Sequence, residues 1–413
     1  MSFRRGKKLF QFWCTVFGMS AIVALFSVAA SAQAPSTIFQ LNGDPASNGS
    51  TCTYGSTAAT CDYWNLINGN GSVLSGTGVG HSALNVFLPA RSNTFNFTTG
   101  GSKDPSPISS WAYGITGTPN KDTLNAAYAA AYSISDFDVI FGADRASPSG
   151  NANIGIWFFQ DNVTLNPGTG KFNGAHRNGD VFVISAFTGG GGTSTISVYA
   201  WDQVGLANAI NGGCAAGVKN PTPGQCADTN LLLLANPTTV CGTSDYCAIT
   251  NGSSVGATWA TTANGYSSGS LASPLFFEGG VDITAAFAAV NATRPCFASF
   301  MEETRSSAST SAVLKDFLLG GFPVCSMSIT KACGTPSFSG GSITFPVGGV
   351  VTNTGIGTLY DVQVNDCIKG ANGSCIATSP VTIVNNTANS LNIGSQTLAA
   401  HETGIWSDSS SST

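Results

Sequence analysis

The sequence predicts an all-β protein: a large, jelly-roll-like antiparallel β-sandwich with one short helix and a disulfide-stapled insertion, followed by a smaller β-sandwich. Three observations favour this fold class. Short apolar runs alternate with turn-rich stretches, glycine occurs 50 times in 413 residues, and only 9% of the residues are charged whereas 42% are hydrophobic. Disordered chains combine high net charge with low hydrophobicity, so this composition indicates a folded chain rich in strands and loops.

Two stretches carry the strand pattern clearly. Residues 154–159 are almost all apolar, which is typical of a strand that is buried on both faces. Residues 194–201 alternate instead, and they place Ile196 and Val198 on the same face. The glycine run at 189–192 lies between these stretches and is a strong turn signal. Strands joined by such turns are expected to be antiparallel.

One helix is expected, over residues 121–132. This segment is rich in alanine and places Leu124, Tyr128 and Tyr132 at helical spacing. Asp122 lies near its start, where a negative charge suits the positive end of the helix dipole. The segment is therefore predicted to be the single short helix of the large sandwich.

The N-terminus has the three-part pattern of a secretory signal peptide. Four basic residues lie within positions 4–8, an apolar run covers residues 9–30, and an Ala-x-Ala site ends at Ala34. We therefore expect residues 1–34 to be removed by cleavage after Ala34, and the mature protein to be secreted or to lie at the cell surface. The apolar run is also long enough to span a bilayer, so an uncleaved membrane anchor is the alternative.

The rest of the chain is expected to form two domains: a β-sandwich head over residues 35–325, with a cysteine-rich insertion at 205–275, and a smaller domain over residues 326–413. A net charge of −5 gives no attraction to nucleic acid. No second apolar span follows the signal peptide, so no membrane insertion is expected after its removal.

Cysteine usage predicts disulfide bonds. Of the twelve cysteines, Cys14 lies in the signal peptide and eleven remain. Export favours oxidation, whereas zinc binding lacks the C-x-x-C pairs and nearby histidines that it needs. The expected pairs are Cys52 with Cys61, Cys214 with Cys226, Cys241 with Cys247, Cys296 with Cys325, and Cys367 with Cys375. Cys333 is then left over.

The C-terminal domain carries a recognisable pattern. Residues 342–355 form a long strand-like run that ends in an Asn-Thr-Gly turn, and Leu359, Val362 and Val364 follow at strand spacing. This pattern resembles the immunoglobulin-like conserved-repeat domain of bacterial surface proteins. The resemblance covers residues 326–413 and implies an immunoglobulin-like β-sandwich that acts as a stalk or spacer. It also implies that the sequence is a fragment of a longer surface protein.

The larger N-terminal part loosely resembles the uncharacterised secreted head domain that precedes such repeats. The stretches that carry this resemblance are residues 39–44, 101–104, 141–145, 155–160 and 303–307. It implies an extracellular location and a β-sandwich architecture, and it implies no particular catalytic activity.

Catalytic motifs are absent from the sequence. There are three histidines, and the chain contains no Gly-x-Ser-x-Gly elbow, no His-Glu-x-x-His and no phosphate-binding loop. A glycosidase needs two carboxylates, which Asp136 and Asp138, or Glu302 and Glu303, could supply. We favour surface or loop charges for these acids, with a hydrolase as the alternative.

Two acid–base clusters stand out in a chain with so few charges. Asp144 and Arg145 follow an apolar strand, and Glu302, Glu303 and Arg305 form the second cluster. Because an unpaired buried charge is costly, these five residues are predicted to form a structural ion-pair network in which at least one arginine bridges carboxylates. A ligand site is the alternative, because charge clusters with perturbed pKa values occur at both kinds of site.

Calcium is the one cofactor that the sequence suggests, because several loops are rich in side chains with oxygen atoms. Its candidate ligands are Asp44, Asp144, Asn151 and Asn153, although asparagine and aspartate are also ordinary turn residues.

Tryptophans in loop-like surroundings are the candidates for ligand binding. Trp64 and Trp111 could stack on sugars if they are exposed, whereas Trp157 and Trp201 have the surroundings of core residues.

These observations favour a secreted or surface-associated, non-enzymatic protein for adhesion or surface display, whose partner is an extracellular glycan or a surface protein. A secreted carbohydrate-active hydrolase is the alternative from another class, and a structural component of a surface layer is the third.

Overall fold

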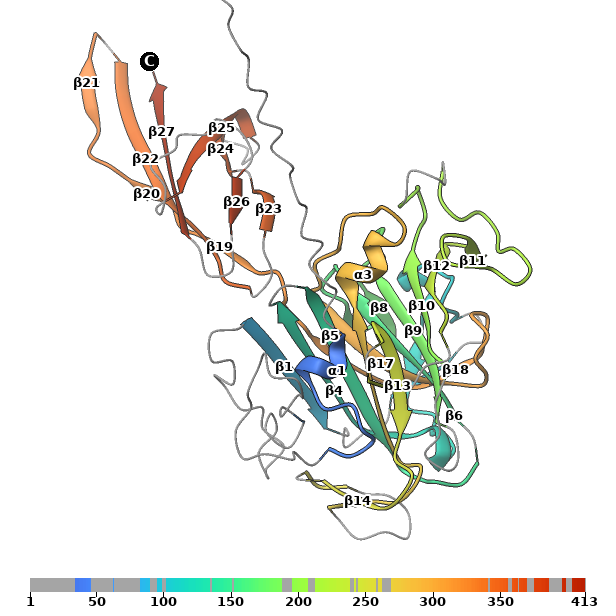
Figure 1. The fold of residues 1–413 in the computed structure, drawn as a ribbon. Coiled ribbons are helices and arrows are strands. Elements are labelled where there is room, and N and C mark those ends of the chain that lie inside the picture. The colour runs from blue at the N-terminus through green and yellow to red at the C-terminus, as the bar shows by residue number, and fades with distance from the viewer. Residues whose placement is uncertain are drawn as a thin grey trace, which may run out of the picture. The chain divides into compact units, whose positions relative to one another are not determined.

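The computed structural model describes most of the chain after Gln33 (Figure 1). The described residues are 34–45, 62, 82–89, 95–98, 102–133, 136–150, 152–187, 195–206, 212–237, 241–242, 244–257, 259–261, 269–340, 342–355, 359–362, 364–369, 375–385, 396–398 and 403–412. They form an almost entirely β structure in which the paired strands are antiparallel, which confirms the predicted fold class.

The first large sheet has five strands. Their order across the sheet is β1 (Ser82–Pro89), β4 (Leu124–Ser133), β5 (Phe137–Arg145), β16 (Phe276–Asp282) and β13 (Tyr246–Thr250). The central strand β5 is buried along its whole length. A strand buried on both faces must be apolar or must pair its polar groups, and β5 carries Asp138, Asp144 and Arg145 among its apolar residues.

The second large sheet has nine strands. Their order is β11 (Cys226–Asp228), β12 (Leu231–Ala235), β10 (Ser197–Trp201), β9 (Val181–Phe187), β6 (Ala152–Phe159), β17 (Ser299–Arg305), β18 (Leu314–Gly321), β2 (Asn96–Phe97) and β3 (Tyr113–Gly114). Strands β6 and β10 lie at the two stretches that the sequence predicts as strands.

An inner core joins the two sheets. Val139 and Phe141 from β5 pack in one cluster with Ile156 and Phe158 from β6. Alternate residues of each strand face this core, as the two-residue period of a strand requires.

Both outer faces are covered as well. Ile140 and Tyr128, on the outer face of the five-stranded sheet, pack against Phe39 from the start of the described chain. On the outer face of the nine-stranded sheet, Trp157 and Trp201 lie in a separate, largely aromatic cluster. The protein therefore has three apolar layers, one between the sheets and one outside each sheet.

The helix predicted at residues 121–132 is wrong. The structure has a short 3₁₀ turn, η2 (Asn120–Asp122), and then strand β4. Tyr128 and Tyr132 are four residues apart, a spacing that puts two residues on the same face of a helix and also of a strand. The small alanines of this segment lie between β1 and β5 and are buried on both faces. Tertiary packing therefore decides against the helical propensity of alanine.

The helices of the described residues are short. Besides η2, they are α1 (Pro35–Ile38), α3 (Ile283–Ala288) and the 3₁₀ turn η1 (Ile108–Ser110). Helix α3 begins at Asp282, whose side chain caps it by accepting a hydrogen bond from the Ala285 N–H at 2.8 Å. Within the described residues, no helix has the length and apolar character needed to cross a membrane.

Among the described residues before Cys325, two pairs of short strands lie outside the two large sheets. β7 (Thr164–Asn166) pairs with β8 (Lys171–Asn173), and β14 (Val255–Gly256) pairs with β15 (Ser270–Leu271).

The strands after Cys325 pair with one another in the part of the chain that the structure describes. One sheet contains β19 (Met327–Ile329), β20 (Ala332–Cys333), β21 (Ser337–Ser339), β22 (Ser342–Asn353), β24 (Val364–Lys369), β25 (Cys375–Asn385) and β27 (Thr403–Ser412), and a second pairs β23 (Leu359–Val362) with β26 (Gln396–Leu398). After β22, the Gly355 N–H donates to Asn353 Oδ1 at 3.0 Å, so the predicted turn is present.

Three of the predicted disulfides are present. Cys214–Cys226, Cys241–Cys247 and Cys296–Cys325 have Cα separations of 5.4, 5.0 and 5.5 Å, inside the range for a bridge. Cys333 is exposed and free, as predicted. The remaining predicted pairs, Cys52–Cys61 and Cys367–Cys375, lie outside the residues whose side chains the structure describes.

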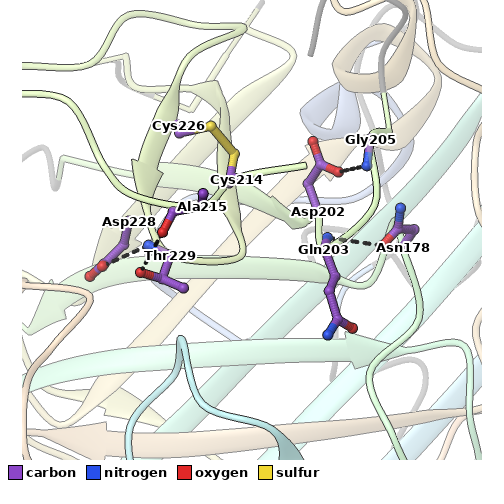
Figure 2. The surroundings of a disulfide bond; sticks show 9 residues. All are labelled: Asn178, Asp202, Gln203, Gly205, Cys214, Ala215, Cys226, Asp228 and Thr229. Carbon is purple, nitrogen blue, oxygen red and sulfur yellow. Dashed lines mark hydrogen bonds between the residues drawn. A yellow bond between two sulfur atoms is a disulfide. The ribbon is translucent and has the colours of Figure 1, made fainter. Parts of the chain in front are cut away.

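The cysteine-rich stretch 205–275 is more than an insertion. It holds two of the disulfides, but it also supplies β11 and β12 to one large sheet and β13 to the other. Figure 2 shows the Cys214–Cys226 disulfide and, beside it, the turn that follows β10, in which Asp202 Oδ1 accepts from the Gly205 N–H at 2.7 Å. Beside it, the Cys214 N–H donates to the Asp202 carbonyl at 2.8 Å.

Removing the Cys214–Cys226 bridge should lower stability without changing the fold. The double variant Cys214→Ser/Cys226→Ser should lose about 2–4 kcal/mol of unfolding free energy in denaturant titrations, because the unfolded chain gains freedom. Cys333→Ser is the matched control and should leave the unfolding free energy unchanged, since Cys333 is exposed and unbridged. A double variant as stable as the parent would show that the bridge contributes nothing.

Candidate functional site

The strongest cluster of polar side chains lies on the outer face of the nine-stranded sheet. Strand β17 alternates there, so that Glu303 and Arg305 point into the aromatic layer while Glu302 lies on the opposite face. Asp104 reaches the same layer from the loop before η1. Asp104 and Glu303 are 0% exposed and Arg305 is 1% exposed, so the whole cluster is removed from water.

Arg305 holds this cluster together. Its Nη2 lies 2.9 Å from Asp104 Oδ2, and its Nη1 lies 3.2 Å from Glu303 Oε1. Its Nε donates to the Ser307 carbonyl at 3.0 Å, and Nη2 also donates to the Ser309 carbonyl. One guanidinium thus joins two carboxyl groups and fastens the loop that follows β17, a geometry that the planar fork of arginine allows.

Burial and the charge of Arg305 act in opposite directions on Glu303. Burial raises the pKa of Glu303 well above its ordinary value, and the neighbouring charge of Asp104 raises it further, whereas the Arg305 guanidinium lowers it. The contacts of Arg305 with both carboxyl groups offset the cost of burying them.

Aromatic rings surround the cluster. Trp157 Nε1 donates to Asp104 Oδ1 at 3.1 Å, and the Trp157 ring stacks on Phe182 with centroids 4.4 Å apart. The Arg305 guanidinium lies 5.2 Å from the centre of the same Phe182 ring. Such rings bind cations through their faces and keep water away.

His176 extends this aromatic layer. Its ring stacks on Trp201 with centroids 3.9 Å apart and lies 4.6 Å from Trp157. Its Nδ1 lies 3.1 Å from Asp180 Oδ2, and Asp180 also accepts from the Arg177 N–H at 3.0 Å. Burial lowers the pKa of His176, so the neutral ring donates from Nδ1 to the carboxylate. The stacking of His176 on Trp201 and a hydrogen bond from the Gln160 N–H to Asp180 Oδ1 at 2.9 Å fix the 171–180 segment against the sheet.

The predicted ion-pair network is correct in part. Arg305 and Glu303 pair as expected, and one arginine does join carboxyl groups. The second carboxylate, Asp104, was missed because it lies some two hundred residues earlier in the sequence and only the tertiary fold brings it close. The five predicted residues also do not form one network of ion pairs, because Asp144 accepts from Trp259 and Arg145 donates to backbone carbonyls.

Arg145 has a different environment from the predicted one. Its Nε donates to the Pro274 carbonyl at 3.1 Å, and its Nη1 donates to the carbonyls of Gly150 at 3.1 Å and Lys121 at 3.4 Å. Burial lowers its pKa to about 10, although the charge of Asp122 acts in the opposite direction. Arg145 therefore ties three loops together at the end of β5.

Asp144 and Glu302 are buried acids with raised pKa values. Asp144 accepts from Trp259 Nε1 at 3.2 Å, and burial raises its pKa to about 7. Burial raises the pKa of Glu302 well above its ordinary value, and the charge of Asp144 adds to the effect. Both acids are 0% exposed, so the prediction of Glu302 as a surface charge is wrong.

The outer face of the five-stranded sheet buries further acids. Glu278 Oε1 accepts from the Gly43 N–H at 2.6 Å, and burial raises the pKa of Glu278 to about 8. Burial also raises the pKa of Asp138 to about 9, and neighbouring aspartates add to this shift. Asp136 and Asp138 are 6% and 0% exposed, which also excludes them as surface charges.

The predicted calcium ligands do not converge. Asp144 lies in the five-stranded sheet and Asn153 lies on β6 of the nine-stranded sheet, while Asp44 is half-exposed in the loop after Leu41. Asn151 falls outside the described residues. Among the residues that the structure describes, no three His, Cys, Asp or Glu side chains are placed to hold a metal ion.

Of the two tryptophans predicted at the surface, the structure describes Trp111, and it is buried. Trp111 is 0% exposed, and its Nε1 donates to the Lys103 carbonyl at 3.0 Å. It packs edge-on against Phe97 and Phe172, so its prediction as a sugar-stacking residue is wrong. Trp157 and Trp201 are core residues, as expected, and Trp64 lies outside the described part of the chain.

Comparisons of the chain with models of protein families, with curated proteins and with solved structures find no match. The roles of these buried polar clusters therefore follow from their geometry alone. A cluster with no exposed atoms cannot reach a substrate, and its ion pairs and hydrogen bonds fasten loops to the sheets.

Arg305→Ala should destabilise the protein strongly. The change leaves the Asp104 carboxylate buried without its counter-charge, so the free energy of unfolding should fall by about 3–5 kcal/mol in denaturant titrations. Arg177→Ala is the matched control, because the Arg177 side chain is 62% exposed and its ion pair with Asp161 is long, at 3.7 Å. It should change stability by less than about 1 kcal/mol. Equal effects of the two substitutions would contradict the structural role of Arg305.

The buried acids predict a protein that is more stable in mild acid than in mild alkali. The pKa values of Asp144, Glu278, Glu302 and Glu303 are all raised in the folded chain. The unfolded chain loses these protons near pH 4, so the folded chain binds more protons from about pH 4 to about pH 8, and the unfolding free energy falls as the pH rises through this range. The pKa of His176 is lowered by burial, so this one group makes the unfolding free energy rise with pH, against the four acids that make it fall.

Thermal unfolding by circular dichroism from about pH 5 to about pH 8 should therefore show a falling Tm. Glu302→Gln cannot ionise and should make this fall shallower, whereas Asp161→Asn, at a half-exposed aspartate, should leave its slope unchanged. A Tm that rises with pH over this range would refute the assignment of protons to the buried acids.

Proposed function

We propose that the chain is an exported, non-enzymatic protein for adhesion or surface display, processed after Ala34. Residues 35–325 form its binding head, and residues 326–413 form an immunoglobulin-like spacer. Its partner is an extracellular glycan or a surface protein, which the head binds through its exposed polar loops.

The observation that carries this proposal is the burial of the acids that could serve a hydrolase. Asp136, Asp138, Glu302 and Glu303 are between 0% and 6% exposed, and each lies within a packed layer. A glycosidase needs its two carboxyls on either side of an open cleft. Acids enclosed by side chains serve the scaffold instead, and function then falls to the loops.

Disulfides support the extracellular location. The three described bridges include Cys296–Cys325, which closes the end of the proposed head. Bridges of this kind form and persist in oxidising compartments, and they are rare where thiols are kept reduced. They also suit a protein that must remain folded without chaperones or repair.

The test uses the mature protein as it is released from cells that express the full sequence. Mass spectrometry should find Pro35 at its N-terminus, and glycan-array and whole-cell binding assays should then detect binding with no release of reducing sugar. Glu303→Gln and Asp138→Asn are matched variants, because both acids are fully buried. Each should lower stability or shift its pH dependence, yet leave the ligand preference unchanged.

Three outcomes would redirect the proposal. Turnover of an oligosaccharide that either variant abolishes would favour a carbohydrate-active hydrolase. Ordered self-assembly without binding to any glycan or cell would favour a structural layer component. A mature protein that still carries the apolar residues 9–30 would favour a membrane anchor over a cleaved signal peptide.

A further inference from the structure

Residues 34–45 form a strap over the outer face of the five-stranded sheet. Helix α1 buries Pro35 and Ile38, and Phe39 follows at 0% exposed. Pro35 lies directly on Gly280 of β16, because a Cβ atom built on Gly280 would come within 2.6 Å of Pro35 Cβ. Any larger residue at position 280 would displace the start of the strap.

Two further contacts fix where the strap begins. The Ser36 hydroxyl donates to the Gly242 carbonyl, just before β13. The Phe39 ring lies 6.3 Å from the ring of Tyr132, which is the direct neighbour of Asp138 across β4 and β5. The first residues of the strap therefore lie at the end of the sheet where Asp138 is found.

This end of the sheet buries an unusual row of acids. Asp138 on β5 and Asp282 on β16 are direct partners across the two strands, and both are 0% exposed. Neither carboxyl oxygen of Asp138 has a hydrogen-bond partner, and Asp282 uses Oδ1 to cap α3 while its Oδ2 has none. Asp136 and Asp245 add negative charge nearby. We call these four residues the aspartate row.

The charges that act on Asp138 are those of other acids. Burial has the largest effect on its pKa, and Asp282, Asp136 and Asp245 raise that pKa further. Tyr132 lies opposite Asp138 on β4, and Arg294, which follows α3, donates to the Thr284 hydroxyl at 3.3 Å. Buried acids in such a place need either bound protons or a cation.

We propose that the aspartate row is the binding site for the chain's own α-amino group, which the removal of the signal peptide creates at Pro35. The inference rests on the processing site of the proposed function. Hydrolysis of the peptide bond between Ala34 and Pro35 consumes one water molecule, and it leaves a carboxylate on Ala34 and a secondary amine on Pro35 that takes up a proton.

The reach of the side chains fits this role. Gly280 and Asp282 are two residues apart on the same face of β16, which separates them by about 7 Å along the strand. Pro35 Cβ lies over Gly280, and Asp138 is the direct cross-strand partner of Asp282. An amine at Pro35 would therefore lie on the same face of the sheet as both carboxyl groups. An ammonium there gives the unpartnered carboxylate oxygens a charged donor.

Burial also sets the order of events. Ala34 is 5% exposed and Pro35 is buried, so a peptidase can cut between them only before the strap docks. Cleavage removes the Ala34 carbonyl, which accepts from the N–H and the hydroxyl of Thr37. Thr37 is half-exposed, so water can replace that carbonyl, whereas Asp138 gains a partner for carboxyl oxygens that have none in the uncut chain.

The experiment compares two forms of the otherwise complete chain, one that starts at Pro35 and one that retains residues 31–34 and so moves the amine away. Asp138→Asn is introduced into both forms. In the Pro35 form it should raise the equilibrium constant of unfolding about tenfold or more near pH 7, because it removes a partner of a buried ion pair. In the extended form it should be neutral or stabilising, because it removes a buried acid that has no counter-charge.

A second readout does not depend on stability. In NMR titrations the Asp138 carboxyl should lose its proton at a lower pH in the Pro35 form than in the extended form, since a nearby ammonium favours the carboxylate. Asp228→Asn, on β11 of the other sheet, is the control and should have equal effects in both forms.

The failures of the two proposals are distinguishable. A secreted chain that starts at another residue overturns the processing site and this inference together. A chain that starts at Pro35, but in which Asp138→Asn and the Asp138 titration are the same in both forms, overturns this inference alone.

Discussion

The guanidinium of Arg305, held between Asp104 and Glu303, is the interaction on which the aromatic side of the molecule depends. It projects from β17, inside the nine-stranded sheet, and it fastens the loop of Asp104 and the loop after β17 to the same point. The surrounding rings exclude water, which strengthens the ion pair and also makes the loss of either partner costly. The covering loops are therefore fixed by charge as well as by apolar contact.

The other side of the molecule meets the same constraint in a different way. The outer face of the five-stranded sheet is covered by a short strap whose contacts are mostly apolar, and Glu278 fixes that strap through the Gly43 N–H. The charges that act on Asp138 in this layer are those of other acids, and neither of its carboxyl oxygens has a hydrogen-bond partner among the described residues. The two outer layers therefore differ in chemistry: one pairs its acids with arginine, whereas the other buries Asp138 beside further aspartates.

These two layers show where the few charges of the chain lie. Only 9% of its residues are charged, and many of its acids are enclosed by side chains in the two outer layers. Burial raises the pKa of several of these acids, so they stabilise the fold more in mild acid than in mild alkali. The local disulfides of Cys214 and Cys241 stabilise the loops between the strands at any pH.

The sequence by itself determined the features that depend on local pattern. Alternating and continuous apolar runs identified β6 and β10, and short spacing within loops identified the bridges of Cys214 and Cys241. Tertiary structure alone decided the features that depend on distant partners. The segment of β4 is a strand because β1 and β5 flank it, although its alanines favour a helix. Asp104 reaches Arg305 only when the sheet folds, because burial and ion pairing act through space and leave no local signal in the sequence.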